Sequence, residues 1–146
     1  MKQKSLRETI IHIKITEIVE CVTLVRENLP QSAEDFMFLG LVKDGIYKRI
    51  EFAIEDIFDI CAIVNTDLEL GVPGEDDDIL DNLVNKNIIS KQMQEKIHAM
   101  KGFRNIVVHR YGKIDDRLAF DLLTAHLNDF ADFIDEIEKF LQNGHL

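Results

Sequence analysis

The chain has 146 residues, a length that fits one domain with a core large enough to need no disulfide or metal support. Apolar residues make up 46% and charged residues 30%, as in ordinary globular proteins, and the net charge of −10 argues against a protein that coats itself with nucleic acid. Only 7 glycines and 2 prolines are available to punctuate a many-stranded sheet, so the composition favours helices.

The cellular compartment is indicated by three features. No apolar run approaches the length of a membrane span, and the N-terminus lacks the apolar block and cleavage site of a signal peptide. The two cysteines, Cys21 and Cys61, each lie in an apolar helical pattern and are expected to be buried, reduced thiols. We therefore expect one domain over residues 1–146, located in the cytoplasm and away from membranes.

The first half of the chain predicts two long helices. A capping box, Ser5 with Glu8 three residues later, predicts the start of the first helix, and Pro30 ends it. Ser32 is the predicted cap of a second helix over residues 33–65, which Gly40 and Gly45 can bend.

The second half begins with an irregular connector over residues 70–78. Its acidic run lacks the spaced ligands of a calcium loop and is expected to mark the start of a short helix over 79–87, with one aspartate capping it. Ser90 then caps a helix that extends to Tyr111, with Gly112 as terminator, and Asp115 caps a last helix that runs to the C-terminus. These elements predict an all-α, up-down bundle of four to five helices.

Positive charge is concentrated in one segment, residues 86–117. It contains eight Lys or Arg and three acidic residues, a local charge of +5 in a chain whose remainder carries −15. Such a site on a repelling body suits brief, selective binding of a polyanion, whereas a solvated helix face with surplus lysines is the alternative interpretation.

Within this segment, residues 100–116 bring together Arg104, Asn105, His109 and Tyr111. Arginine binds phosphate through a planar fork of donors, and histidine exchanges a proton near neutral pH. The group is a minimal set for chemistry at a phosphodiester. The chain has no Gly-rich phosphate loop, no zinc motif and no nucleophile elbow that would point elsewhere.

Arg104 occupies an unusual place on its helix. The apolar face runs through Met93, Ile97, Met100 and the valines at 107 and 108, and Arg104 lies about 20° from Met93 on a helical projection. A buried arginine needs a partner. Either it pairs with an acid of another helix, for which Glu51 and Glu55 are candidates, or it lines a cleft.

The spacing between Arg104 and His109 also matters. Five residues correspond to about 140° around an ideal helix, so one helix does not aim both side chains at one point. A two-fold dimer that pairs this helix with its own copy would bring two Arg/His sets into one cleft.

The run RNIVVHRY at 104–111 resembles the R-x4-6-H motif of HEPN domains, in the R-x4-H-x-Y form of HepT-like toxins. Other features follow that family's order: RIEFAIE in the second helix, the LGVP linker, the MKGFRN approach and YGKID before the last helix. The resemblance extends from about residue 10 to residue 141.

The resemblance implies a dimeric all-α bundle that acts as the metal-independent RNase toxin of a type VII-like toxin–antitoxin module. Arg104 and His109 would be catalytic, Asn105 would assist, and a minimal nucleotidyltransferase antitoxin would neutralise the toxin by transferring AMP to Tyr111. No metal or cofactor is implied. The basic residues around the motif are the candidates for RNA contacts: Lys101, Arg110 and Lys113.

Two alternatives remain open at this point. The bundle could be a non-catalytic module that docks a nucleotidyltransferase or holds a nucleotide, with Arg104 as the phosphate clamp. It could also be purely structural, with Arg104 in a buried ion pair whose loss would cost about 3–5 kcal/mol of stability.

Overall fold

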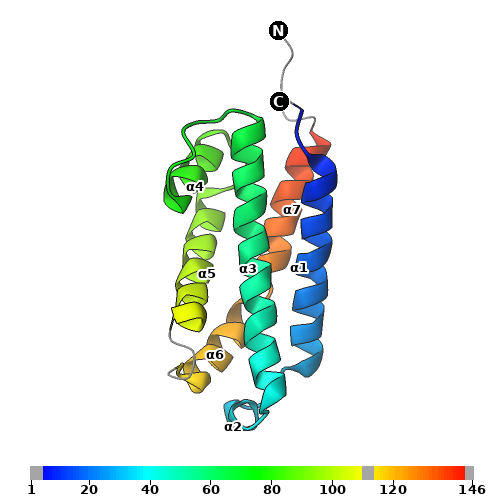
Figure 1. Ribbon diagram of the computed structural model, residues 1–146, viewed down its shortest axis with the longest axis vertical. Coiled ribbons are helices and arrows are strands. Elements are labelled where there is room, and N and C mark those ends of the chain that lie inside the picture. Colours follow the sequence, from blue (N-terminus) through cyan, green and yellow to red (C-terminus); the bar gives the residue numbers. More distant parts are fainter. Residues whose placement is uncertain (1–4, 110–113, 144–146) are drawn as a thin grey trace.

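The computed structural model describes residues 5–109 and 114–143. The described part contains seven helices and no strand, which confirms the all-α class but exceeds the predicted four to five helices (Figure 1). The helices are α1 (Glu8–Asn28), α2 (Ala33–Met37), α3 (Leu41–Asp67), α4 (Asp76–Asn85), α5 (Lys91–His109), α6 (Asp116–His126) and α7 (Asp129–Gln142).

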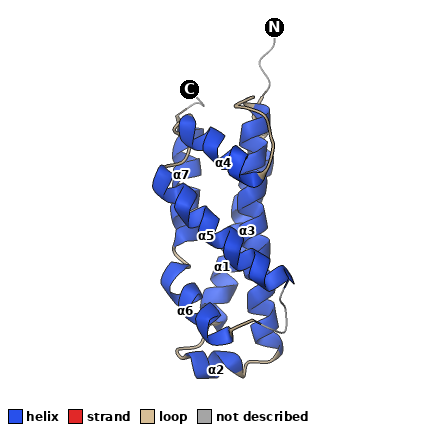
Figure 2. Ribbon diagram, turned by 90° about the vertical axis from the view of Figure 1, so that its left-hand side faces the viewer, coloured by secondary structure: helices blue, strands red, loops and turns tan. Residues whose placement is uncertain are grey.

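The long helices alternate in direction, as predicted for an up-down bundle. In Figure 1, α1 descends, α3 rises, α5 descends, and α6 with α7 return to the upper end. The central helix α3 contacts α1, α4 and α5, while α2 packs against α6 at the lower end (Figures 1 and 2). The buried side chains of α3, among them Ile50, Ile57 and Ile60, form the middle of a single core.

The predicted second helix over 33–65 is in fact two helices, α2 and α3. The break lies at Gly40, whose φ of 63° belongs to the left-handed region that favours glycine. Gly45, in contrast, lies inside α3, and a Cβ placed there would meet nothing within 4 Å. The sequence correctly identified Gly40 as a weak point, but the chain turns a corner there instead of bending.

The predicted last helix is likewise divided, into α6 and α7. Leu127 and Asn128 keep backbone angles in the helical region, so the division is a change of direction without an irregular loop. Long-range contacts fix it: Leu127 is buried in the core, and Arg26 of α1 donates a hydrogen bond to the Asn128 side chain at 3.2 Å. No Gly or Pro marks this position, so local sequence carries no signal for it.

Three of the predicted caps are confirmed by hydrogen bonds, and the one predicted at Ser5 is wrong. The side chains of Ser32, Ser90 and Asp115 each accept a backbone N–H three residues later, at 3.0–3.1 Å. Helix α1, however, begins at Glu8 and not at the Ser5 capping box. The backbone N–H and Nε of Arg7 both donate to Asp67 at the end of α3, and this contact determines where α1 starts.

Buried polar contacts hold α4 beside α3 and α5. The Asn65 side chain, fully buried, accepts from Asn82 of α4 at 2.9 Å and donates to the Gly71 carbonyl of the connector at 3.3 Å. Gln94 of α5, also buried, donates to Asp81 of α4 at 2.6 Å. The acidic run lies in the first turn of α4 as predicted, although the cap residue is Glu75, not an aspartate. These contacts place the acidic end of α4 against α5.

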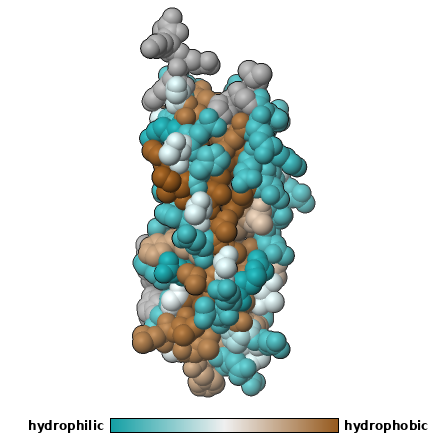
Figure 3. Space-filling model, turned by 90° about the vertical axis from the view of Figure 1, so that its right-hand side faces the viewer, coloured by the Kyte–Doolittle hydropathy of each residue, from teal (hydrophilic) through white to brown (hydrophobic). Residues whose placement is uncertain are grey.

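One face of the molecule carries exposed apolar side chains. Figure 3 shows apolar surface at the lower end, where Figure 1 places α2. At the corner between α2 and α3, Phe38 is 86% exposed and Leu41 is 87% exposed. Exposed apolar surface of this kind is typical of protein interaction sites.

None of the described helices has a stretch long and apolar enough to cross a bilayer.

Candidate active site

Helix α5 carries most of the predicted site residues, and its start is firmly held. Besides capping the helix, Ser90 donates from its backbone N–H and its hydroxyl to the Glu136 carboxylate of α7, at 2.7 and 3.0 Å. The apolar face of α5 is buried as predicted, with Ile97 fully enclosed and Val107 4% exposed. The helix contacts α3, α4 and α7 and continues without interruption to His109.

Arg104 lies on that buried face, and its side chain is only 20% exposed. Its guanidinium carbon lies 5.0 Å from the ring centre of Phe58 on α3, a cation–π contact. The nearest carboxylate is Asp76 of α4, whose Oδ2 is 3.9 Å from Nη2. The sequence predicts Glu51 or Glu55 of α3 as the ion-pair partner of Arg104. This prediction is wrong, because the carboxylate belongs to α4.

The guanidinium donates no hydrogen bond to any other residue that the structure describes. A separation of 3.9 Å is an ion pair at long range and is too far for a hydrogen bond. The guanidinium therefore lies against an aromatic ring, and its N–H groups have no hydrogen-bond partner among the described residues. An arginine in this state can bind a phosphate without first breaking hydrogen bonds within the protein.

A row of basic side chains continues along α5 from Arg104, at intervals of three residues. Lys101 Nζ lies 3.9 Å from Asp76 and 3.7 Å from Asp77, and His98 Nε2 lies 3.1 Å from Asp77. The first turn of α4 thus faces the basic side of α5 with two carboxylates. Sequence reasoning recognised the acidic run as a helix start but had no means of placing it opposite this row.

The remaining predicted residues are distributed as follows. Asn105 is exposed, one residue beyond Arg104. His109 is the last residue of α5, and the regular backbone places its Cα about 140° around the helix from that of Arg104. The predictions for Arg110, Tyr111 and Lys113 lie outside the described residues. The structure therefore brings together Arg104 and Lys101, and adds Phe58 and Asp76, which no local motif signals.

The residues that follow the motif are anchored to α3. Asp116, the first residue of α6, accepts a hydrogen bond from the Tyr47 hydroxyl at 2.6 Å and one from Lys43 Nζ at 2.8 Å. The Tyr47 ring is buried and lies against Phe36 at an edge-to-face angle. This contact fixes the point at which the chain resumes after the end of α5.

The two cysteines are unsuited to nucleophilic chemistry. Both are free and buried, as predicted. Burial raises the pKa of the Cys61 thiol to about 12, and burial also raises the pKa of Cys21. A thiol that stays protonated at neutral pH does not act as a nucleophile. Among the described residues, no group of three His, Cys, Asp or Glu side chains is arranged to hold a metal ion.

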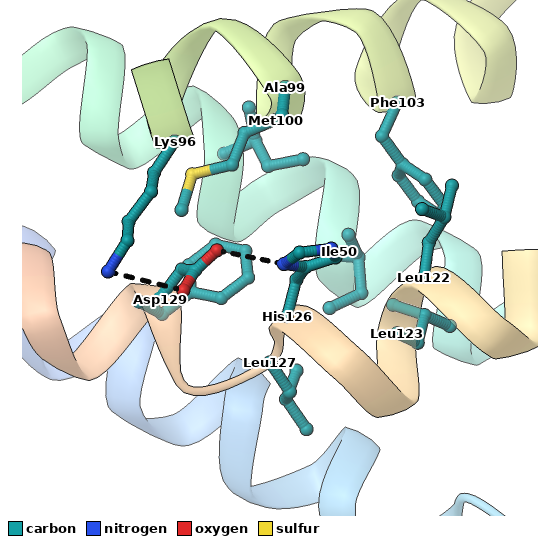
Figure 4. A pocket seen from close by; sticks show the side chains of 12 residues that line it. Ile50, Lys96, Ala99, Met100, Phe103, Leu122, Leu123, His126, Leu127 and Asp129 are labelled. Atoms are coloured by element: carbon teal, nitrogen blue, oxygen red, sulfur yellow. Dashed lines mark ion pairs between the residues drawn. The ribbon is translucent and has the colours of Figure 1, made fainter. Parts of the chain in front are cut away.

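A small cavity lies on another side of α5, enclosed by α3, α6 and α7 (Figure 4). Its volume is about 100 Å³, and its wall is mainly apolar, with Met100 and Phe103 on the α5 side. At its edge, Asp129 lies 3.6 Å from Lys96 and 3.3 Å from His126, so the carboxylate and the ammonium group are paired with each other. None of the predicted site residues lines it, and a cavity this small holds little more than a single ring.

Comparisons with known proteins support the resemblance to a nuclease family. The chain is similar to the mRNA nuclease HepT of Shewanella oneidensis, with 28% identity over 132 residues that cover 88% of this chain and 96% of the relative. A solved structure of the tri-AMPylated S. oneidensis HEPN toxin in complex with MNT antitoxin matches with a TM-score of 0.81 and 27% identity, covering 89% of this chain and 97% of that one.

A more distant structure shares the fold alone. YutE of Bacillus subtilis, a cytosolic protein of unknown function, matches with a TM-score of 0.82 at 19% identity, covering 97% of this chain and 94% of that one.

The family model described as "Ribonuclease HepT-like" matches residues 18–137, which include all of α3, α4 and α5 and the motif at 104–111. The chain therefore belongs to the HepT-like ribonuclease family.

Proposed function

We propose that this protein is the RNase toxin of a toxin–antitoxin pair, acting in the cytoplasm on RNA without a metal ion. The observation that carries the proposal is the state of Arg104: a largely enclosed guanidinium that lies over Phe58 and donates no hydrogen bond to the described residues, on the helix that carries His109. Membership of a family whose relatives include an mRNA nuclease supports the choice of substrate.

The proposed reaction is transesterification within the RNA backbone. The 2′-hydroxyl attacks the adjacent phosphorus, the bond from phosphorus to the 5′-oxygen breaks, and a 2′,3′-cyclic phosphate and a 5′-hydroxyl result. His109 acts as general acid or base, on the leaving 5′-oxygen or on the 2′-oxygen. Arg104 binds the non-bridging oxygens, whose negative charge grows as the phosphorane forms. Asn105 orients the phosphate or the imidazole, and the RNA backbone is held by Lys101 together with Arg110 and Lys113.

A two-fold homodimer completes the site in this proposal. Because α5 is regular up to His109, the backbone of one chain places residues 104 and 109 about 140° apart around the helix. If each site takes its arginine from one chain and its histidine from the other, mixing Arg104→Ala with His109→Ala protein forms heterodimers with one intact site. Such mixtures should regain up to about a quarter of wild-type activity, because half of the dimers are mixed and each has one of two sites.

The proposed regulator is a minimal nucleotidyltransferase that transfers AMP to Tyr111. The related S. oneidensis toxin is AMPylated and in complex with MNT antitoxin. An adenylyl group next to the site would block RNA by its bulk and its negative charge. The exposed apolar corner at Phe38 and Leu41, toward the end of the bundle where α5 finishes, is suited to binding a protein (Figure 1).

The test is cleavage of a defined RNA by purified protein in the presence of EDTA. We expect products with 2′,3′-cyclic phosphate ends. His109→Ala should abolish cleavage, whereas the matched control His12→Ala, which removes an exposed histidine of α1, should retain it. A Tyr111→Phe variant should cleave RNA but resist neutralisation by a nucleotidyltransferase with ATP. Cleavage that requires a metal ion, or that survives His109→Ala, would contradict the mechanism. RNA or nucleotide binding without cleavage would favour the non-catalytic module.

A further inference from the structure

The first turn of α4 places two carboxylates beside the basic side chains of α5. Asp76 Oδ2 lies 3.9 Å from Arg104 Nη2 and also 3.9 Å from Lys101 Nζ. One carboxylate oxygen therefore stands between two cations. Asp77, next in the chain, lies 3.7 Å from Lys101 and 3.1 Å from His98.

The two contacts of Asp76 are electrostatic and do not form a fixed structural bridge. The side chains of Arg104 and Lys101 donate no hydrogen bond to any residue in the described part of the chain, and 3.9 Å exceeds hydrogen-bonding distance. The Asp76 side chain is 38% exposed, so water competes for it and the pair contributes little to stability. Other polar groups hold α4 in place, notably the Asn82–Asn65 and Gln94–Asp81 hydrogen bonds.

A phosphate group fits this position better than the carboxylate does. It carries its charge on oxygens that spread farther from the central atom, so it can accept hydrogen bonds from the Arg104 fork and from Lys101 at once. RNA binding would then displace a competing internal anion, because both negative groups cannot be close to the same two cations without repelling each other.

We infer that Lys101 and Arg104 form a phosphate subsite for the RNA backbone and that Asp76, assisted by Asp77, is a built-in competitor that limits RNA affinity. This inference rests on the proposed function, since it names the group that RNA must displace at the same site. It assigns to the acidic first turn of α4 a role in setting substrate affinity, in addition to its favourable place at a helix start.

The experiment measures binding of a short, fluorescein-labelled 2′-O-methyl oligoribonucleotide by fluorescence anisotropy over a series of salt concentrations. The 2′-O-methyl group removes the attacking hydroxyl, so binding is measured without cleavage. Asp76→Asn should lower Kd by about two- to fivefold relative to wild type, the range of an exposed ion pair. The plot of log Kd against log salt should steepen by up to about 0.7, the value expected when the protein neutralises one additional phosphate.

The matched control is Asp135→Asn, which makes the same change in net charge at an exposed position of α7. A second background, Lys101→Gln with Arg104→Gln, removes the proposed subsite while keeping the side-chain stems. There, Asp76→Asn should have no more effect than the control. Thermal unfolding followed by circular dichroism checks that each variant is folded, and Asp77→Asn provides a second test with a smaller expected increase in affinity.

Equal affinities of Asp76→Asn and Asp135→Asn, or weaker binding by Asp76→Asn, would overturn the inference. An increase in affinity that persists in the Gln background would also overturn it, because the effect would then not act through Lys101 and Arg104. If wild type cleaves RNA but any of these results is found, the proposed function stands and only this inference is removed. If neither wild type nor Asp76→Asn binds or cleaves RNA, both fail.

Discussion

Replacement of Arg104 by alanine separates a role in the reaction from a role in stability. The substitution removes the cation–π contact with Phe58, worth about 0.5–2 kcal/mol, and an ion pair with Asp76 at 3.9 Å, worth about 0–1 kcal/mol at partial exposure. We expect Arg104→Ala to lose about 1–2 kcal/mol of unfolding free energy and all detectable RNA cleavage. If Arg104 were instead in a buried, hydrogen-bonded ion pair, the substitution would lower the free energy of unfolding by about 3–5 kcal/mol.

The assay pairs urea unfolding, followed by far-ultraviolet circular dichroism, with cleavage at a urea-free condition where the variant is fully folded. Arg26→Ala is the control, since it removes an arginine whose contact is the exposed side chain of Asn128. It should retain cleavage. A loss of about 3–5 kcal/mol of unfolding free energy in Arg104→Ala, with wild-type cleavage by the fully folded variant, would refute the reasoning and leave Arg104 as a structural residue.

Three further predictions concern the scaffold. Burial, followed by the charge of Glu17, raises the pKa of Asp56 from 3.8 to about 6, so the folded state holds this proton more tightly and stability falls as pH rises from about 4 to about 6. Asp56→Asn should remove that fall and add about 1–3 kcal/mol at pH 8 in urea unfolding; an unchanged pH profile would contradict this. Tyr47→Phe, which removes the 2.6 Å hydrogen bond to Asp116, should cost about 1–3 kcal/mol, and a change below about 0.5 kcal/mol would show that this contact is unimportant. Gly102→Ala fills open space on an exposed helix face and should raise the free energy of unfolding by about 0.5–1 kcal/mol, measured as a higher melting temperature. Loss of cleavage in the stabilised protein would indicate that another molecule approaches α5 there.

Local sequence predicted those features that local contacts determine. The caps at Ser32, Ser90 and Asp115 depend on groups within three residues, and all three hydrogen bonds are present. The start of α1 was misplaced because Arg7 binds Asp67, sixty residues away, and that contact outweighs a capping box. The division between α6 and α7 was missed for the same reason, since tertiary contacts and not a helix-breaking residue produce it.

The candidate site shows the same limit. Helical periodicity placed Arg104 on the buried face of its helix, and its 20% exposure confirms this. Periodicity specifies a face, but not which residue of another helix lies opposite it, so Asp76 and Phe58 could not be identified from spacing. The assignments of catalytic roles to Arg104, Asn105 and His109, and of modification to Tyr111, remain predictions.

The geometry of α5 and the charge around Arg104 bear on the same question, which is how the site is completed. Within one chain, the arginine is directed toward α3 and α4 by Phe58 and Asp76, while the helix carries His109 to a different side. Neither interaction holds the guanidinium strongly, since one is a ring contact and the other a long ion pair. A phosphate brought in on RNA can therefore draw the arginine outward at little energetic cost, but it cannot bend a regular helix to bring His109 across. In the proposed site, the arginine side chain can adjust, whereas the backbone of α5 sets the position of residue 109. This is why the proposal needs a second chain and does not need α5 to unwind.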